Sequence, residues 1–105
     1  MFTTHSECEF YDPRDNKWTC FASTNQKRSR AGVTSLNRHI YAIGGYNGTK
    51  NMASVEFYDP LSNVWTYTAN MGVKRSCHGA AQLNGLLYAA GGYDGMIVTL
   101  LITSR

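Results

Sequence analysis

The sequence predicts an all-β protein built from a repeated sheet module, and three observations support this prediction. Short runs of aromatic and β-branched residues alternate with turn residues such as Asn-Gly and Asp-Pro. The 3.6-residue periodicity of an amphipathic helix is found nowhere in the sequence. Residues 8–48 align without a gap on residues 55–95, with 21 identities in 41 positions. The offset of 47 residues, from Trp18 to Trp65, lies within the range of about 40–50 residues that β-sheet repeats use.

The clearest element is the stretch at residues 40–48. Its first four residues, Ile-Tyr-Ala-Ile, favour a buried strand. Gly44 and Gly45 then remove two side chains, which indicates that another part of the chain approaches the backbone closely. The Asn-Gly pair that follows is a strong turn signal. Residues 87–95 repeat the pattern, so the sequence predicts two equivalent strands that each end at a glycine pair.

The other elements follow in chain order, each strand ending at turn residues. The first strand candidate ends at Pro13, because proline fixes φ and lacks a backbone donor. A polar turn and a second strand candidate follow, and a polar loop then leads to a strand of small and apolar residues. Asn37-Arg38 is predicted to be a tight turn. The strand candidates of this first cycle are residues 8–11, 18–21, 31–36 and 40–45, and the cycle restarts at residue 54.

Composition excludes several classes of protein. The 105 residues suffice for one small domain, and 43% hydrophobic with 16% charged residues indicates a globular chain. A net charge of +3 is too weak to indicate nucleic-acid binding, which usually requires concentrated positive charge. The longest apolar run, residues 96–102, is too short to span a bilayer. We therefore expect no nucleic-acid partner and no membrane association.

The cysteines indicate a reducing compartment. Cys8, Cys20 and Cys77 are odd in number, widely spaced and without a Cys-x-x-Cys pair, so they do not form a disulfide framework. The first residues lack both the basic and the apolar region of a secretory signal. We therefore expect a cytoplasmic protein with free thiols, and the nucleus is the alternative location.

This pattern resembles the Kelch repeat, and the resemblance covers residues 7–95. The shared pieces are the glycine pairs, a tyrosine three residues before each pair, the Glu-Phe-Tyr-Asp-Pro segments and the spaced tryptophans. The resemblance implies four-stranded blades of a β-propeller. It is greatest to the Kelch-like adaptors, which join a BTB domain to a six-bladed propeller that recruits substrates to a cullin-RING ubiquitin ligase. The structural repeat residues are Trp18, Trp65, Tyr41, Tyr88, Gly44, Gly45, Gly91, Gly92, Arg28, Arg75, Glu9 and Glu56.

The resemblance divides the chain into one complete blade flanked by two half blades. Residues 1–22 are expected to form the second half of one blade, and residues 23–69 a complete repeat. Residues 70–105 are expected to form the first half of a third blade with a divergent apolar tail. The large side chains of Tyr41, Tyr88, Trp18 and Trp65 are expected to fill the space between facing sheets. The expected strands are residues 7–11, 18–22, 31–36, 40–45, 54–58, 64–68, 77–83 and 86–91.

Two blades' worth of strands do not close a ring, because propellers need about four to eight blades. The chain is therefore either a fragment of a longer product or a self-assembling unit. One copy's last strands would complete a blade with the first strands of the next copy, and three copies would give six blades. The apolar run at residues 96–102 has two interpretations. The simpler one is an ending that happens to be apolar, and the alternative is a substitute third strand.

Catalysis has little support in the sequence. His78 adjoins Cys77, but neighbours on a strand point to opposite faces, and His5 and His39 lie apart from both. No His-x-His or Cys-x-x-Cys spacing indicates a metal site, so we expect neither a metal nor a cofactor. Some Kelch propellers are copper oxidases with Tyr and His ligands, and this sequence does not recreate such a cluster. Glu9 and Glu56 occupy equivalent positions and are expected to hydrogen-bond within the repeat, with Arg28 or Arg75.

A protein or peptide partner has more support. The resemblance implies that it lies over one end of the propeller channel, against loops that enter first strands and leave second strands. Arg30 stands where such adaptors can place an arginine for acidic peptides, and the second repeat has Cys77 there. Tyr46 and Tyr93 offer a ring with a polar tip, although packing between blades is their alternative role. The candidate partner-binding residues are Ser29, Arg30, Tyr46, Lys50, Asn51, Ser76 and Tyr93.

Two classes of function therefore stay open, with a third more distant. The leading hypothesis is the substrate-recognition module of a ubiquitin-ligase adaptor. The alternative is a Kelch protein that binds actin in the cytoskeleton, and a fragment of a Kelch-type oxidase is the distant alternative. The sequence does not identify the partner.

Overall fold

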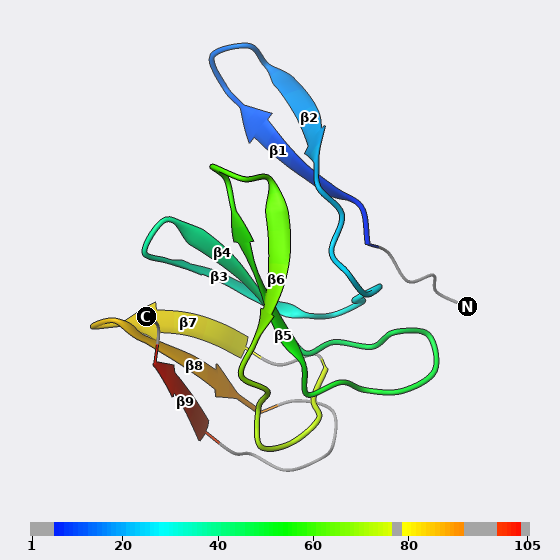
Figure 1. The fold of residues 1–105 in the computed structure, drawn as a ribbon, viewed down its shortest axis with the longest axis vertical. Coiled ribbons are helices and arrows are strands. Elements are labelled where there is room, and N and C mark those ends of the chain that lie inside the picture. The colour runs from blue at the N-terminus through cyan, green and yellow to red at the C-terminus, as the bar shows by residue number, and fades with distance from the viewer. Residues whose placement is uncertain (1–5, 77–78, 92–98, 104–105) are drawn as a thin grey trace.

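The computed structural model describes residues 6–76, 79–91 and 99–103, which form nine β-strands in three antiparallel sheets (Figure 1). The prediction of an all-β protein is confirmed. These described residues contain no helix, and hence none that could cross a membrane. The strands are β1 (Cys8–Asp12), β2 (Lys17–Phe21), β3 (Gly32–Leu36), β4 (His39–Ile43), β5 (Val55–Asp59), β6 (Val64–Thr68), β7 (Gly79–Leu83), β8 (Leu86–Ala90) and β9 (Thr99–Thr103).

The middle sheet is a complete four-stranded unit in the order β3-β4-β5-β6. Its first turn is tight because Asn37 and Arg38 take φ values of 52° and 65°, which match the twist of the two strands. Asn84 and Gly85 repeat this turn between β7 and β8, with φ values of 54° and 81°. The predicted tight turn at Asn37-Arg38 is therefore confirmed.

The third sheet differs from the predicted two-stranded half. Residues Thr99–Thr103 form β9, which pairs with β8 through the register Leu87↔Ile102 and Ala89↔Leu100. The simpler interpretation of an incidental apolar ending is thus wrong, and a substitute third strand is what the structure contains. The physical reason is that β8 presents an open edge of backbone donors and acceptors, which a segment of high strand propensity can pair. Gly92 and Tyr93, which precede β9, lie outside the described residues.

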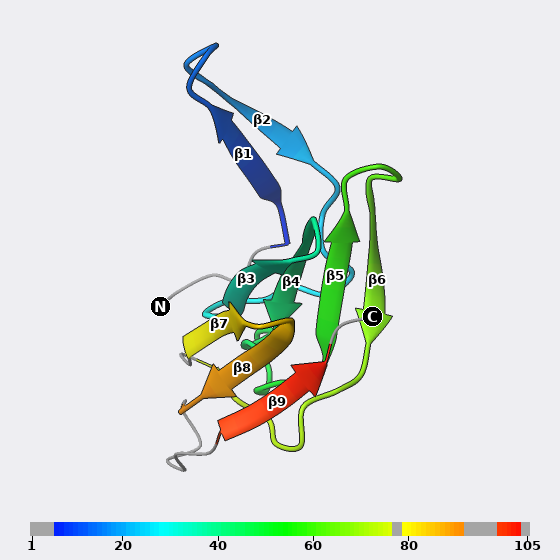
Figure 2. The ribbon, with the colours of Figure 1, turned by 90° about the vertical axis from the view of Figure 1, so that its left-hand side faces the viewer.

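The middle sheet packs on both of its faces. On the face toward the third sheet, Tyr41 and Ile43 pack with Leu87 and Ala89, and β3 lies beside β7 (Figure 2). On the other face, a second cluster joins Ala42, Tyr58 and Trp65 to Cys8, Phe21, Ala22 and Ile40. Since residues of β4 alternate between these clusters, this strand is the shared wall of both cores.

The two repeat tryptophans have opposite environments. Trp65 is 7% exposed and donates its Nε1–H to the carbonyl oxygen of Ala22 at 2.7 Å. Trp18 is 65% exposed, although its ring lies 5.3 Å from that of Tyr11, much as Trp65 lies 5.4 Å from Tyr58. The expectation that Trp18 fills a space between sheets is therefore wrong for this chain. The β1–β2 hairpin covers Trp65, whereas no described sheet lies against the Trp18 side of the hairpin.

The close approach predicted at the glycine pair is confirmed at Gly45. A Cβ atom there would lie 2.9 Å from the carbonyl oxygen of Ser29 and 3.2 Å from Cβ of Ala31. The residue also has a φ of 104°, a conformation that side chains disfavour. Its N–H donates to the carbonyl oxygen of Arg75 at 2.9 Å, so this backbone joins the middle sheet to the third.

Substituting Gly45→Ala is expected to lower the free energy of unfolding by about 1–3 kcal/mol, because alanine would be strained at this φ and would press on Ser29. Urea unfolding measures the change. Gly79→Ala is the matched control, since a Cβ there meets nothing within 4 Å. Equal stability of the two variants would contradict the proposed close approach.

Candidate functional site

Three loops come together at one end of the sheets. They comprise residues 22–31, 44–54 and 69–76, and we call them the loop face. Ser29 and Tyr46 exchange two backbone hydrogen bonds, of 2.9 and 2.8 Å. Asn51 then pairs with Tyr46 through an isolated bridge. The side chain of Ser76 donates to Oδ1 of Asn51 at 2.9 Å, which links the middle sheet to the third.

The structure thus brings four of the candidate residues into one bonded group. Ser29, Tyr46 and Asn51 are partly exposed. Ser76 is 1% exposed and bonded to Asn51, so the expectation that it offers its hydroxyl to a partner is wrong. Tyr93 lies outside the described residues. Among the candidates that the structure describes, Ser76 therefore orders the loops while the others reach the surface.

The two charged candidates, Arg30 and Lys50, are both exposed. Arg30 follows the bonded Ser29 and has a φ of 57°, a left-handed conformation that is uncommon for arginine. Lys50 closes a turn in which Oδ1 of Asn47 accepts from the N–H groups of Thr49 and Lys50, at 2.9 and 3.0 Å. The backbone therefore holds both basic residues at defined positions.

The loop face is positively charged. Its three loops contain no Asp or Glu. They carry four exposed basic residues. The exposed Glu7 lies beside the first loop, where it lines a pocket together with Thr24 and Ala31, whereas Asp12, Asp15 and Asp59 lie at the β1–β2 and β5–β6 turns. Glu56, the carboxylate closest in sequence to these loops, is fully buried. The exposed basic residues are Lys27, Arg30, Lys50 and Lys74.

A buried ion pair holds these loops in place. Nε of Arg28 lies 2.9 Å from Oε2 of Glu56. Arg28 also donates to the carbonyl oxygens of Gly44 and Ser54, at 2.8 and 3.0 Å. Glu56 accepts from the N–H of Asn25 at 2.7 Å. Of the two arginines expected beside this acid, Arg28 is the one that pairs with it, and the pair fixes loop geometry.

Arg75 and Glu9 are the repeat equivalents of Arg28 and Glu56. Arg75 is 1% exposed and donates to the carbonyl oxygen of Gly91 at 3.0 Å. Glu9 is exposed on β1. The two equivalent carboxylates, Glu9 and Glu56, therefore have different surroundings in this chain.

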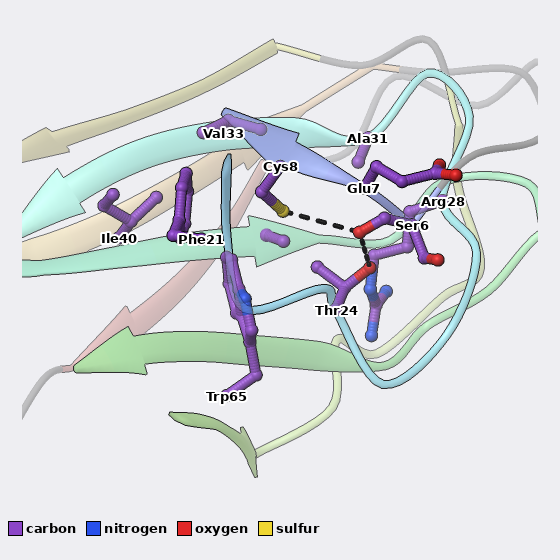
Figure 3. Close-up of a pocket in the computed structure, with 11 residues that line it drawn as sticks. Ser6, Glu7, Cys8, Phe21, Thr24, Arg28, Ala31, Val33, Ile40 and Trp65 are labelled. Atoms are coloured by element: carbon purple, nitrogen blue, oxygen red, sulfur yellow. Dashed lines mark hydrogen bonds between the residues drawn. The ribbon is translucent and has the colours of Figure 1, made fainter. Parts of the chain in front are cut away.

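An apolar pocket of about 200 Å³ lies between the β1–β2 hairpin and the middle sheet (Figure 3). Burial raises the pKa of the Cys8 thiol, which keeps it protonated and weakly nucleophilic. Sequence reasoning did not find this pocket, because it arises where two sheets meet. Its apolar walls include Cys8, Phe21, Val33, Ile40, Ala42 and Trp65.

Metal ligands are not grouped in the part of the chain that the structure describes. No set of three or more His, Cys, Asp or Glu residues comes together there. His39 packs its ring 5.0 Å from that of Phe57. Cys77 and His78 lie outside the described residues.

Comparison with known proteins agrees with this architecture. The model of the Kelch motif matches residues 27–72 and 74–103. The chain belongs to the Kelch-motif family. The second match includes β9, so the divergent tail is part of a Kelch repeat. The predicted resemblance to this family is therefore confirmed.

Curated relatives match over less than half of the chain. Kelch-like protein 9 of Mus musculus is 42% identical over 45 residues, which is 43% of this chain. Kelch-like protein 5 of Homo sapiens is 43% identical over 51 residues, or 48% of the chain. Kelch-like protein 3 of Homo sapiens is 45% identical over 41 residues, or 39% of the chain. Each match covers 7% of the relative, so this chain corresponds to a small part of such proteins.

Replacing Arg28 by Met is expected to lower the free energy of unfolding by about 3–5 kcal/mol, because Glu56 would remain buried without its cation. Thermal or urea unfolding measures the loss. The control is Arg14→Met, which removes an exposed ion pair with Asp12, and we expect no measurable change there. A similar stability for both variants would contradict the structural role of the buried pair.

Proposed function

We propose that the loop face binds an acidic segment of a protein partner. Kelch repeats form protein-interaction modules, and this chain is one by its family. The observation that carries the finer proposal is the charge of the loop face, which has exposed Lys and Arg residues and no Asp or Glu in its loops. Opposite charge accelerates encounter and selects partners of the right sign.

Arg30 is the central residue of this proposal. Its guanidinium can bind a carboxylate through two parallel N–H···O bonds, which gives both energy and orientation. The backbone bonds of the neighbouring Ser29 fix the point from which the side chain extends. Tyr46 adds a partly exposed ring with a polar tip, and Lys50 adds a second positive charge.

We further propose that this module recruits substrates within a larger cytoplasmic adaptor of a ubiquitin ligase. The support is similarity to Kelch-like proteins, of which the chain covers 7%. Contact with a cullin would have to come from another part of such a protein, because the loop face accounts for substrate binding alone. Actin binding is the competing role, and co-sedimentation with actin filaments distinguishes it.

Arg30→Gln is expected to weaken binding of an acidic peptide by about tenfold or more, because a charge-assisted hydrogen bond is lost. Titration of immobilised chain with acidic peptides measures the affinity, and added salt should weaken it further. The matched control is Arg38→Gln, since Arg38 is also exposed and left-handed, with a φ of 65°, but lies at the opposite turn.

A pull-down with mass spectrometry extends the test to natural partners. The wild type and Arg38→Gln are expected to capture the same proteins, and Arg30→Gln is expected to lose them. If all three capture identical partners, the assignment of this loop face is wrong.

A further inference from the structure

The outer hairpin β1–β2 has an open edge that matches a strand elsewhere in the chain. Among the described strands, β1 pairs with β2 alone. Its sequence Glu9-Phe10-Tyr11-Asp12 is identical to Glu56-Phe57-Tyr58-Asp59 in β5, which pairs with β4. The internal copy of β4 is β8, since Tyr41-Ala42 recurs as Tyr88-Ala89. Strand β8 therefore has the sequence that the open edge of β1 would accept.

We propose that β1 of one copy of this chain pairs with β8 of a second copy, so that two incomplete sheets form one blade. The apolar pocket beside β1 marks the uncovered space (Figure 3). Val33, at the wall of this pocket, is 62% exposed. In the assembled blade, β7 and β8 of the second copy would lie there and cover it.

Charge complementarity supports this occupant. In the middle sheet, Glu56 lies opposite Ala42 in the register and pairs with Arg28. The repeat equivalents of these three residues are Glu9, Ala89 and Arg75. Glu9 is exposed on β1. Pairing β1 with β8 of a second copy places the Glu9 carboxylate beside Arg75 of that copy, as Glu56 lies beside Arg28.

The exposed tryptophan supports the same geometry. Trp65 is covered by the β1–β2 hairpin and donates to the carbonyl oxygen of Ala22. The repeat equivalent of Ala22 is Ala69, at the end of β6. In the assembled blade, Trp18 would face the middle sheet of the second copy and donate its Nε1–H to the carbonyl oxygen of Ala69 in that copy. This contact would bury a ring that is 65% exposed in the single chain.

Strand β9 competes for the same edge. It pairs with β8 in the single chain, where Leu100 lies opposite Ala89 in the register. Glu56 holds the corresponding position in the middle sheet. Strand β9 thus protects the β8 edge without supplying a carboxylate at this position. Assembly requires β9 to leave, and Glu9 of the second copy then takes that register position.

The contact is heterologous, because the edge of β1 meets a different edge, that of β8. Such contacts form rings when the rotation closes. Rings of about four to eight blades would need roughly two to four copies, since each copy contributes two blades' worth of strands. The pairing edges of β1 and β8, together with Glu9 and Trp18, lie outside the loop face, while their proposed partners Arg75 and Ala69 belong to its third loop. The inference requires no acidic partner protein, so it does not depend on the proposed function.

The first test is sedimentation velocity of the purified chain of residues 1–105 over a range of concentrations, combined with tryptophan fluorescence. We expect a discrete oligomer of two to four copies and a blue shift of the emission as Trp18 becomes buried. A monomer at every concentration, or an oligomer in which the emission of Trp18 does not shift, would overturn the proposal.

Variants test the ion pair between copies. Glu9→Gln should lower the association constant by about tenfold or more, because a charge-assisted bond is lost. Asp15→Asn is the matched control, since Asp15 is an exposed acid at the β1–β2 turn, and it should leave association unchanged. Equal association of the two variants would overturn the proposed Glu9–Arg75 contact. Both acids are exposed in the single chain, so neither variant should impair folding.

A third variant tests the competition with β9. Leu100→Pro and Leu101→Pro together should weaken β9 pairing, because proline removes donors from the ladder. Association between copies is then expected to increase. Unchanged or weaker association would show that β9 does not compete with the second copy, and would overturn that part of the proposal.

Discussion

The structure depends on the way in which each sheet buries its faces against its neighbours. A single antiparallel sheet of this size has no core of its own, and repeat units become stable by stacking. The middle sheet meets this requirement on both faces, through the cluster around Ile43 and the cluster around Trp65. The buried pair Arg28–Glu56 then fixes the loops at the end of this stack. The loop face is therefore a product of stacking and not of the loops alone.

Strand order and turns were predictable because they depend on local chemistry. The repeated Asp-Pro and glycine-pair segments place strand ends within one or two residues of those in the structure, as β5 at Val55–Asp59 illustrates. The close approach at Gly45 follows from the absence of a side chain, and the loop residue Ser29, which bridges to Tyr46, is the group that approaches it. Local sequence carries these features since each needs few residues to specify it.

Features that depend on distant partners were less predictable. Strand β9 forms because β8 has an open edge, which cannot be read from the composition of residues 96–102. The exposure of Trp18 depends on which sheets surround it, although Trp18 and Trp65 hold equivalent positions in the repeat. Ser76 is likewise buried where it bonds to Asn51, in the loop between β4 and β5 of the neighbouring sheet. Repeat identity therefore predicts conformation more reliably than it predicts environment.

This difference between conformation and environment has a physical consequence. Glu9 and Glu56 are both followed by Phe-Tyr-Asp-Pro and both lie in a strand, yet one is exposed and the other is buried in an ion pair. Burying a carboxylate is unfavourable unless a cation and several donors compensate for the lost water. Glu56 on β5 has this compensation, because Arg28 and backbone donors surround it. Its repeat equivalent on β1, Glu9, has a side chain suited to the same surroundings, which the described part of the single chain does not supply. The repeat sequence therefore specifies the contacts of a complete four-stranded sheet even at positions where the single chain does not form them.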